Sequence, residues 1–327
     1  MSVEAIGRFA GQRVLVIGDL MLDEFIWGKV SRISPEAPVP VVDVTGESYY
    51  PGGAANVARN LREFTPHTSV IGLAGADAYG DRLCALLQSS GIDASGVQRS
   101  AESATIVKTR IIARNQQVVR VDRERQAPLT PSQFDRLRRD LSEVIPRADG
   151  IVVADYGKGL LDQQVAGLIV ALAREHCKVL TVDPHPHTSL NWRGATAIKP
   201  NRIEAFSAAG MRLTPPVDPP QCDVGLSQAI ERLMRLWEPQ TLLVTLGEQG
   251  MLLLNGDAAP FHIPTRAQEV FDVSGAGDTA IAVFTLGLLA GTSPREAADL
   301  ANRASGIAVG KLGTATVTPA ELRATFA

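Results

Sequence analysis

Short apolar runs that end in Gly or Asp recur along this chain of 327 residues. Each run is apolar on both faces, which is the pattern of a strand buried in a parallel sheet. Such strands are expected at residues 13–19, 69–75, 150–155, 178–183, 195–201 and 241–247. Segments of helical length lie between them, at residues 54–64, 79–91, 131–145, 164–176 and 226–237. This alternation predicts an α/β fold with a doubly wound, mostly parallel sheet flanked by helices.

Two segments interrupt the alternation of strand and helix. Residues 38–47 and 104–124 show the partial apolar alternation of antiparallel strands, and the second segment is expected to form a hairpin around Asn115–Gln117. Because no helix separates these strands, they predict a small β lid that projects from the main domain, with an extension of the main sheet as the less favoured alternative. The Pro-rich stretch 214–220 is expected to be a surface loop. The chain, residues 1–327, is thus expected to be a single domain with a lid.

Composition and charge narrow the class of function. The formal net charge is −3, which gives no basic surface for nucleic acid or an anionic membrane. The three cysteines, Cys84, Cys177 and Cys222, form no C-x-x-C pair, so neither a disulfide framework nor a zinc site is expected. The N-terminus has no signal-peptide pattern, and no stretch reaches the ~18 apolar residues that a membrane helix needs. A cytoplasmic protein with small-molecule partners is expected.

The segment FDVSGAGDTA, residues 271–280, places small residues directly before an apolar helix. A helix N-terminus favours an anion, and Gly275, Ala276 and Gly277 leave its N–H groups uncovered. Asp278 would lie in the first turn, where its carboxylate can accept the proton of an attacking hydroxyl. An anion hole beside a carboxylate base is what phosphoryl transfer requires. The structural alternative is a glycine-rich turn in which Asp278 caps the helix.

Other phosphate-binding and nucleophile motifs are absent from the sequence. GADAYGDR, residues 75–82, has the glycine spacing of a Walker A loop but lacks its Lys and Ser/Thr. No G-x-G-x-x-G follows the first expected strand, and Ser274 lacks the preceding Gly of a nucleophile elbow. P-loop, Rossmann and α/β-hydrolase interpretations are therefore disfavoured.

Polar residues follow the first expected strand and begin the helix after it. The carboxylates in GDLMLD, residues 18–23, stand beyond the carboxyl end of a strand, where open α/β sheets bind ligands and where carboxylates can accept hydrogen bonds from sugar hydroxyls. In YPGGAANVARN, residues 50–60, the glycines allow close backbone approach and the asparagines share a helix face. The candidate sugar ligands are Asp19, Asp23, Gly52, Gly53, Asn56 and Asn60. A capped helix with solvated asparagines is the structural alternative.

Four motifs together resemble a known family. GGAANVARN and DVSGAGD resemble the signature pair of the ribokinase-like, or PfkB-type, carbohydrate kinases, and they occur in the same order. KPNRIE, residues 199–204, is similar to the N-x-x-E motif of that family, and TLGEQGM, residues 245–251, to its T-x-G-x-x-G motif. The resemblance covers nearly the whole chain. It implies an ATP-dependent kinase that transfers the γ-phosphate to a sugar hydroxyl.

The resemblance also implies roles for individual residues. Asp278 would be the catalytic base, and the backbone of Gly275, Ala276 and Gly277 would form the anion hole. Residues that match the nucleotide motifs would bind ATP, namely Asn201, Glu204, Thr245, Gly247, Gly250 and Asn302. Glu204 would hold Mg²⁺ through water, and Asp272 would help form a site for a monovalent cation such as K⁺. The lid would close over the sugar and pair with the lid of a second subunit in a homodimer.

A finer resemblance concerns the sugar. RISPEAPVPV (32–41), ARNQQVVRVDRE (113–124) and DYGKGLL (155–161) are similar to the heptose-7-phosphate kinases of ADP-heptose synthesis. Such enzymes phosphorylate the anomeric hydroxyl of D-glycero-D-manno-heptose 7-phosphate. Lys158 follows the strand expected at 150–155 and is a candidate contact for a substrate phosphate, with a solvated loop lysine as the alternative. Some relatives carry a nucleotidyltransferase domain. Because this sequence ends at Ala327, nucleotide transfer is expected from another protein.

The chain departs from the heptose kinases near one strand end. They read VDPKG where this chain has VDPHPHTSLNW, residues 182–192, and they commonly have Thr where this chain has Lys199. A PfkB-type kinase of another sugar or sugar phosphate, such as ribose, fructose or fructose 6-phosphate, is therefore the alternative. A non-catalytic sugar- or nucleotide-binding regulator is a third hypothesis, which the presence of Asp278 disfavours.

Overall fold

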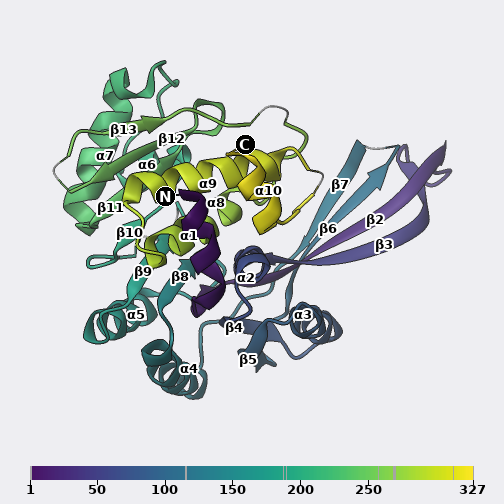
Figure 1. Cartoon of the computed structure of the whole chain (residues 1–327). Coiled ribbons are helices and arrows are strands. Elements are labelled where there is room, and N and C mark those ends of the chain that lie inside the picture. The colour runs from purple at the N-terminus through teal and green to yellow at the C-terminus, as the bar shows by residue number, and fades with distance from the viewer. Residues whose placement is uncertain are drawn as a thin grey trace.

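Strands and helices alternate along the chain, and most strands join one large sheet (Figure 1). The computed structural model describes residues 2–114, 116–186, 188, 190–256, 258–267, 270–311 and 313–326. The strands of the large sheet are β1 (Val14–Gly18), β4 (Thr68–Gly75), β5 (Asp93–Ser100), β8 (Gly150–Ala154), β9 (Val179–Asp183), β10 (Ala197–Ile198), β11 (Thr241–Thr245), β12 (Met251–Asn255) and β13 (Phe261–Ile263). Their order is β13-β12-β11-β10-β9-β8-β1-β4-β5, with antiparallel pairing only at β12 and β13 among the described residues. The predicted mostly parallel sheet is confirmed.

Every strand expected in the large sheet is present, and three further strands were missed. β5 is half-exposed at the sheet edge, so its sequence DASGVQRS carries no continuous apolar run. β12 and β13 follow the T-x-G-x-x-G segment and fold back antiparallel without a helix between them. β10 is much shorter than the expected 195–201, because Pro200 lacks the N–H that a longer strand would use.

Helices flank the sheet. They are α1 (Ser2–Arg8), α2 (Ala54–Phe64), α3 (Ala78–Ser89), α4 (Pro131–Val144), α5 (Gln163–Glu175), α6 (Arg202–Ala208), α7 (Val224–Trp237), α8 (Ala276–Leu289), α9 (Pro294–Val309) and α10 (Pro319–Ala324). The helices expected at 54–64, 79–91, 131–145, 164–176, 226–237 and after Gly275 lie at nearly the expected positions, whereas α1, α6, α9 and α10 were not predicted. Side-chain caps set several helix starts, such as the Thr130–Gln133 capping box of α4 and the Asp162 cap of α5. Because these signals are local, the predicted helix ends were nearly correct.

The two faces of the sheet bury different side chains of the same strands. In β1, Leu15 and Ile17 pack with residues of α4, α5, α6 and α7, whereas Val14 and Val16 pack with residues of α1, α2, α8 and α9. The sheet is therefore buried on both faces, which explains its continuous apolar runs. The carboxyl ends of β1, β8, β9, β10 and β11 meet at one edge of the sheet, next to the N-terminus of α8.

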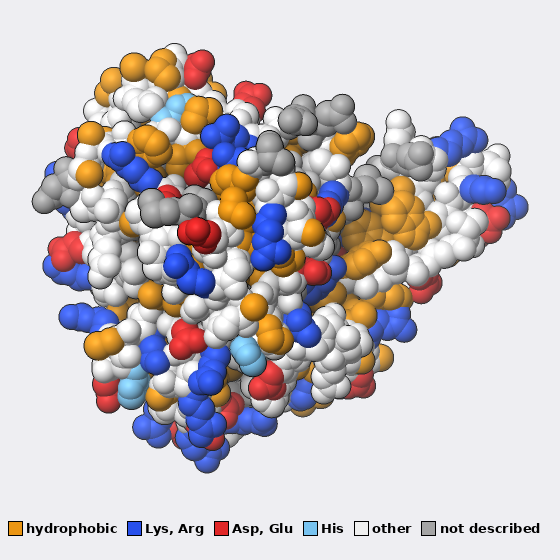
Figure 2. All heavy atoms as spheres, in the orientation of Figure 1, with side chains coloured by type: hydrophobic (Ala, Val, Ile, Leu, Met, Phe, Trp, Pro, Cys, Tyr) orange, Lys and Arg blue, Asp and Glu red, His pale blue; other side chains and the backbone are white. Residues whose placement is uncertain are grey.

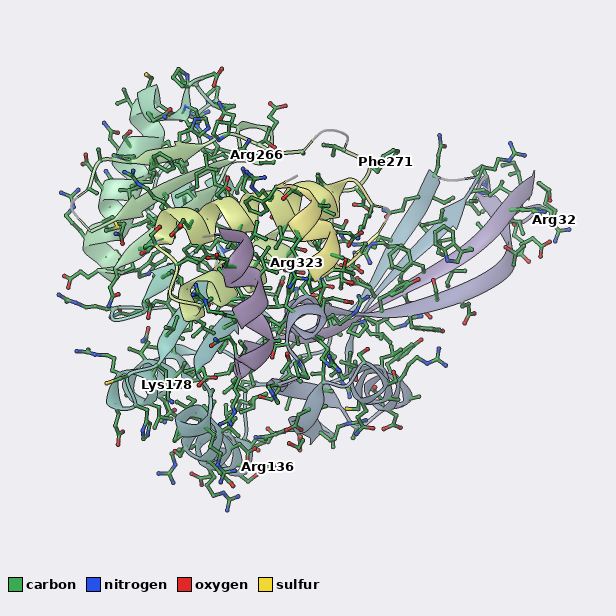
Figure 3. All side chains as sticks on the ribbon, in the orientation of Figure 1. Arg32, Arg136, Lys178, Arg266, Phe271 and Arg323 are labelled. Carbon is green, nitrogen blue, oxygen red and sulfur yellow. The ribbon has the colours of Figure 1, made fainter. Side chains whose placement is uncertain are left out.

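A second sheet projects from the side of the molecule (Figure 1). Its strands are β2 (Leu20–Ile33), β3 (Pro40–Gly53), β6 (Ile106–Ala113) and β7 (Gln116–Arg123), in the order β3-β2-β6-β7. Arg32 lies near its outer tip (Figure 3). The predicted small β lid and its hairpin are thereby confirmed, although Asn115 itself lies outside the described residues. β2 was missed because it follows β1 after a single residue, Asp19, with no turn signal between them.

The surface agrees with two further expectations. Residues 214–219 of the Pro-rich stretch are exposed and irregular, as predicted. No helix in the described part of the chain is long and apolar enough to cross a membrane. Lys, Arg, Asp and Glu side chains are interspersed over the visible face of the main body, and hydrophobic side chains gather on the projecting sheet (Figure 2).

Candidate active site

Asp278 lies in the first turn of α8, between a glycine-rich turn and two hydrogen-bond donors. Gly275 precedes the helix at φ +80°, and a Cβ there would lie 2.9 Å from the Asn56 amide nitrogen. The amide Nδ2 of Asn56 donates to one oxygen of Asp278 at 2.6 Å. The hydroxyl of Tyr156 donates to the other oxygen at 2.5 Å. The structure therefore brings Asn56 and the predicted base together from residues far apart in the sequence.

Burial controls the charge of this carboxyl group. Burial raises the pKa of Asp278 to about 6, even though the bonds from Tyr156 and Asn56 favour the charged form and lower it. The group is therefore ionised at neutral pH and becomes protonated as the pH falls through about 6. A carboxyl group with a pKa near the working pH suits a general base.

The backbone at the start of α8 offers donors to an anion. Among the described residues, no acceptor lies within hydrogen-bond reach of the N–H groups of Gly277 and Asp278. The N–H of Ala276, by contrast, lies 3.3 Å from the carbonyl oxygen of Val273. Two N–H groups and the positive end of the helix thus face the space beside Asp278.

A pocket of about 500 Å³ opens beside these N–H groups. Among the residues that line it are Thr245, Gly247, Gly250, Ala276, Gly277, Ser305 and Val309. Three predicted nucleotide-binding residues and two predicted anion-hole residues therefore share one cavity. Its lining is mostly apolar, which suits the nucleobase and the ribose of a nucleotide.

Gly250 shapes this pocket through its backbone. Its φ is +85°, and an added Cβ would lie 2.1 Å from the carbonyl oxygen of Ile263. Gly247 in the same turn has φ +60°, but no described residue apart from its chain neighbours lies within 4 Å of an added Cβ.

Gly250→Ala is expected to lower the free energy of unfolding by about 3 kcal/mol, because it adds a clash to a strained backbone. Gly247→Ala, which adds the strain without the clash, should cost only about 1 kcal/mol. Urea denaturation of both variants measures the difference. Equal effects would contradict the role assigned to the Gly250 contact.

The N-x-x-E segment forms a helix cap in this structure. The Asn201 side chain accepts the N–H of Glu204 at 2.9 Å, and Glu204 accepts the N–H of Asn201 at 2.7 Å, which closes a capping box at the start of α6. Asn302 is buried, and its amide donates to the carbonyl of Pro264 at 2.6 Å. Asn302 therefore holds the 264–267 segment that borders the nucleotide pocket, and is not one of its lining residues.

On the sugar side, Asp19 is engaged by backbone groups. Its carboxylate accepts the N–H groups of Tyr156, Lys158 and Leu160 at 3.0, 2.9 and 3.2 Å. Asp19 is buried and so anchors the loop that follows β8. Asn60 is also fully buried, where it accepts the hydroxyl of Thr279, so it does not face a ligand as the sequence suggested.

Asp23, Gly52 and Gly53 lie together where β2 and β3 leave the main body. Asp23 is buried and forms an ion pair with Arg110 of β6. A Cβ on Gly52 would overlap the carboxylate of Asp23, and Gly53 has φ +58° at the start of α2. These glycines let the strand pass closely over the acidic side chain.

Two lysines, Lys158 and Lys199, pair with different carboxylates. Lys158 pairs with Glu124 at 2.8 Å. Lys199 is buried, lies 3.0 Å from Asp183, and its ammonium would be 3.5 Å from a Cβ on Gly277. Burial alone would lower the pKa of Lys199, but nearby carboxylates, chiefly Asp183, raise it above its usual value. Lys199 therefore carries a fixed positive charge beside the start of α8.

Asp272 lies in the turn before α8. Its carboxylate accepts the N–H groups of Ser274 at 2.9 Å and Gly313 at 3.1 Å. These bonds join the turn to the segment after α9. Burial would raise the pKa of Asp272, but these bonds outweigh it and hold the pKa below its usual value.

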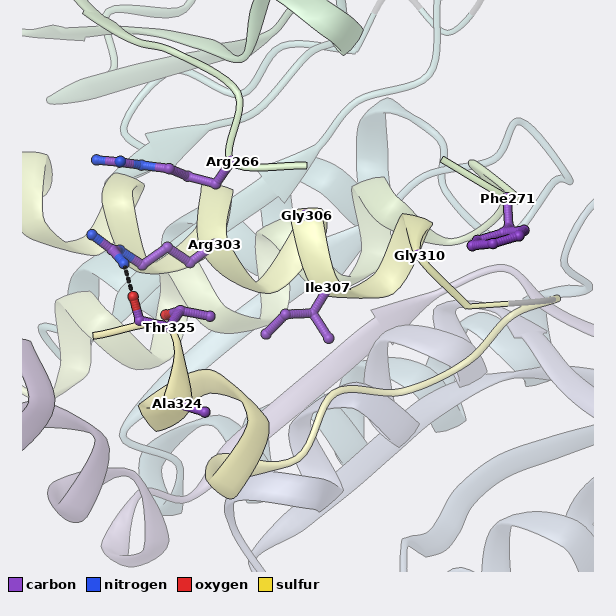
Figure 4. A pocket seen from close by; sticks show the side chains of 8 residues that line it. All are labelled: Arg266, Phe271, Arg303, Gly306, Ile307, Gly310, Ala324 and Thr325. Atoms are coloured by element: carbon purple, nitrogen blue, oxygen red, sulfur yellow. Dashed lines mark hydrogen bonds between the residues drawn. The ribbon is translucent and has the colours of Figure 1, made fainter. Parts of the chain in front are cut away.

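Two other cavities lie near the site. One of about 590 Å³ opens between the projecting sheet and the 313–315 segment, with Phe25, Trp27, Tyr50 and Arg59 among its lining. Another of about 710 Å³ lies between α9 and the chain's C-terminal turn, where Arg303 donates to the carbonyl of Thr325 (Figure 4). None of the residues that line this second cavity is a predicted site residue.

Sequence reasoning did not identify Tyr156 and Lys199 as neighbours of the catalytic machinery. Tyr156 stands next to Asp155 at the end of β8, and Lys199 directly follows β10. Both positions are strand carboxyl ends, which is the signal that could have marked them. The contact each makes depends on the order of strands in the sheet, which the sequence pattern leaves open.

Comparison with known proteins identifies the family. The family model described as pfkB family carbohydrate kinase matches residues 12–321. The bifunctional protein HldE of Geobacter metallireducens is 44% identical over 308 residues, which cover 94% of this chain and 61% of that protein. The bifunctional protein HldE of Helicobacter pylori J99 is 41% identical and covered to 65%. The chain thus spans less than two thirds of the length of these relatives.

Solved structures share the fold. A ribokinase from Giardia lamblia matches with a TM-score of 0.75 at 19% identity, over 96% of this chain and 98% of that one. The phosphofructokinase-2 of Escherichia coli in complex with potassium matches with a TM-score of 0.74 at 19% identity, over 96% and 97%. With the family match over nearly its whole length, and with Asp278 set at a bare helix N-terminus beside a pocket, the chain belongs to the pfkB family of carbohydrate kinases.

Proposed function

We propose that this kinase transfers the γ-phosphate of ATP to the anomeric hydroxyl of D-glycero-D-manno-heptose 7-phosphate. The observation that carries the phosphoryl transfer is the position of Asp278, between the 500 Å³ pocket and the cluster of Asp23, Gly52 and Asn56. The choice of sugar rests on the heptose-kinase-like segments 32–41, 113–124 and 155–161. Because ATP is a cytoplasmic substrate, we also propose a cytoplasmic location.

The proposed reaction needs one base and one anion site. The anomeric O–H gives its proton to Asp278 while its oxygen forms a bond to the γ-phosphorus. The bond from that phosphorus to the bridging oxygen of ADP breaks, and ADP leaves. The N–H groups of Gly277 and Asp278 and the ammonium of Lys199 would stabilise the charge on the transferred group.

The site residues suit the cations that such a reaction uses. In nucleotide sites Mg²⁺ is commonly held by one or two carboxylates, water and phosphate oxygens. Glu204 uses one carboxylate oxygen in its capping bond and would offer the other. Mg²⁺ would neutralise the charge of the nucleotide phosphates. Asp272, Ser274 and Gly313 form the turn at which we propose a K⁺ site.

The projecting sheet supplies the remaining roles in this proposal. As a lid over the sugar it would exclude water from the phosphoryl group. We also propose that it pairs with the sheet of a second subunit in a homodimer. β7 supports this, since all of its residues are exposed and Val118, Val119 and Val121 are 39%, 45% and 42% exposed. Lys158 and Arg110 would exchange their present carboxylate partners for the substrate phosphate.

The test is ADP release with D-glycero-D-manno-heptose 7-phosphate, ribose, fructose and fructose 6-phosphate at equal concentrations. We expect kcat/KM for the heptose phosphate to exceed kcat/KM for each of the other sugars by several powers of ten. A preference for another sugar would support the alternative that this chain is a kinase of that sugar, with the altered 182–192 segment and Lys199 as its distinguishing features. Saturable binding without ADP formation would instead favour a non-catalytic regulator.

A further inference from the structure

The hydroxyl of Tyr156 is part of the active site but has no role in the chemistry proposed above. It lies 2.5 Å from one carboxylate oxygen of Asp278, and the Asn56 amide lies 2.6 Å from the other. Each carboxylate oxygen can accept two hydrogen bonds, so with respect to the described residues each retains a free lone pair. The two contacts therefore fix the plane of the carboxylate without preventing a sugar hydroxyl from binding to it.

Asp19 sets the position of Tyr156. The loop after β8 folds over the end of β1, and three of its N–H groups, those of Tyr156, Lys158 and Leu160, converge on the Asp19 carboxylate. Hydrogen bonds to a charged acceptor are stronger than those between neutral groups. The tyrosine hydroxyl is thus held by the loop rather than by a flexible side chain alone.

We propose that Tyr156 is a positioning residue for the base: its hydroxyl, held in place by Asp19, orients the Asp278 carboxylate toward the sugar and stabilises its ionised form. This inference rests on the proposed function, because it requires Asp278 to act as the base. It also gives Asp19 a part in catalysis that differs from the direct sugar contact expected from the sequence.

Other charged groups near Asp278 act on it as well. Asp183 at the end of β9 disfavours its ionised form, whereas Lys199 at the end of β10 favours it. Glu204 of α6 lies close enough to Tyr156 to raise the pKa of the phenol, and Arg59 of α2 donates to the Asn56 side chain at 3.4 Å. These groups are unchanged when only the phenol oxygen is removed, so such a variant isolates the contribution of Tyr156.

Tyr156→Phe is the test. Catalysis requires ionised Asp278, which is present above its pKa of about 6 and is lost as the pH falls through that value. Loss of the hydroxyl bond should raise the pKa of Asp278 further, so the acid limb of kcat/KM should move up by about one pH unit. Turnover at pH 6.5 should fall about threefold and recover above pH 8, while KM for ATP stays unchanged. An acid limb that stays in place would overturn the proposal, whatever the loss of turnover.

A matched control tests whether the effect is specific to Tyr156, and a second variant replaces Tyr156→Phe if that variant does not fold. Tyr49→Phe removes another hydroxyl that donates to a carboxylate, that of Glu47 at 2.8 Å on β3, and should leave the acid limb unmoved. If Tyr156→Phe does not fold, 3-fluorotyrosine at position 156 keeps the shape, strengthens the donor and should move the limb to lower pH. If Asp278 were not the base, Asp278→Asn would retain turnover, so that failure is recognised separately. If Asp278→Asn is inactive but the acid limb does not move in Tyr156→Phe, only the role proposed for Tyr156 is refuted.

Discussion

Asp278→Asn is expected to lower turnover by on the order of 10²-fold or more while ATP and sugar still bind. The amide cannot accept the proton of the attacking hydroxyl, so the base is lost. It also places an NH₂ group where Asn56 or Tyr156 now donates, so one of those hydrogen bonds is lost with it. Steady-state ADP release measures turnover, and calorimetric titration measures the binding of each substrate.

The matched control for this prediction is Asp81→Asn. Asp81 is also an acid in the first turn of a helix, α3, but its side chain is 77% exposed and pairs with Arg99 far from the site. This variant should keep full turnover. Near-normal turnover in Asp278→Asn would remove the base from the mechanism, and loss of substrate binding would mean that the carboxylate is required for binding.

Gly277→Val is expected to abolish most phosphoryl transfer with little effect on folding. Among the described residues outside the helix backbone and the chain neighbours, the one atom within 4 Å of an added Cβ is the Lys199 ammonium nitrogen, at 3.5 Å. The new side chain therefore enters the space beside the bare N–H groups. It would stand where the γ-phosphate is proposed to lie. Because loss of one such donor costs about 10²- to 10³-fold in turnover, kcat/KM for ATP should fall by at least about 10²-fold.

Gly167→Val provides the comparison, because Gly167 lies on the exposed face of α5, and no described residue beyond its own helix backbone and chain neighbours has an atom within 4 Å of an added Cβ. Both variants place a β-branched residue in a helix, so their thermal midpoints should change by similar amounts. Only Gly277→Val should lose activity. If its activity were unchanged, the anion site would have to lie elsewhere.

Much of the fold could be predicted because its determinants are local. The apolar run of β8 and the helical segment of α5 depend on neighbouring residues, and both appear close to where the pattern placed them. β2 was missed because the chain passes from β1 into the projecting sheet through Asp19 alone, and no helix or loop separates the two strands. β5 was missed because an edge strand needs little apolar surface.

In the candidate site, as in the fold, local features could be predicted from the sequence and long-range contacts could not. The motifs identified Asp278 and the small residues before it, because consecutive residues determine whether the N–H groups at a helix N-terminus are left uncovered. The sequence assigned Asp19 a direct contact with sugar, but the structure shows its carboxylate bonded to the loop after β8. A carboxylate in a motif shows only that an anion is present; which donor it meets depends on the neighbouring strand.

The class of fold, the positions of most helices and the glycine-rich turn before α8 follow from the amino-acid sequence, because hydrophobic periodicity and glycine positions act over a few residues. Tyr156 and Asn56 meet at Asp278, and Lys199 lies beside Gly277, because of how distant elements pack in three dimensions. Tyr156 and Asp278 are 122 residues apart, and they meet because the strand order brings the end of β8 under the start of α8. The packing of the sheet against α8 sets that contact, which therefore cannot be predicted from neighbouring residues in the sequence.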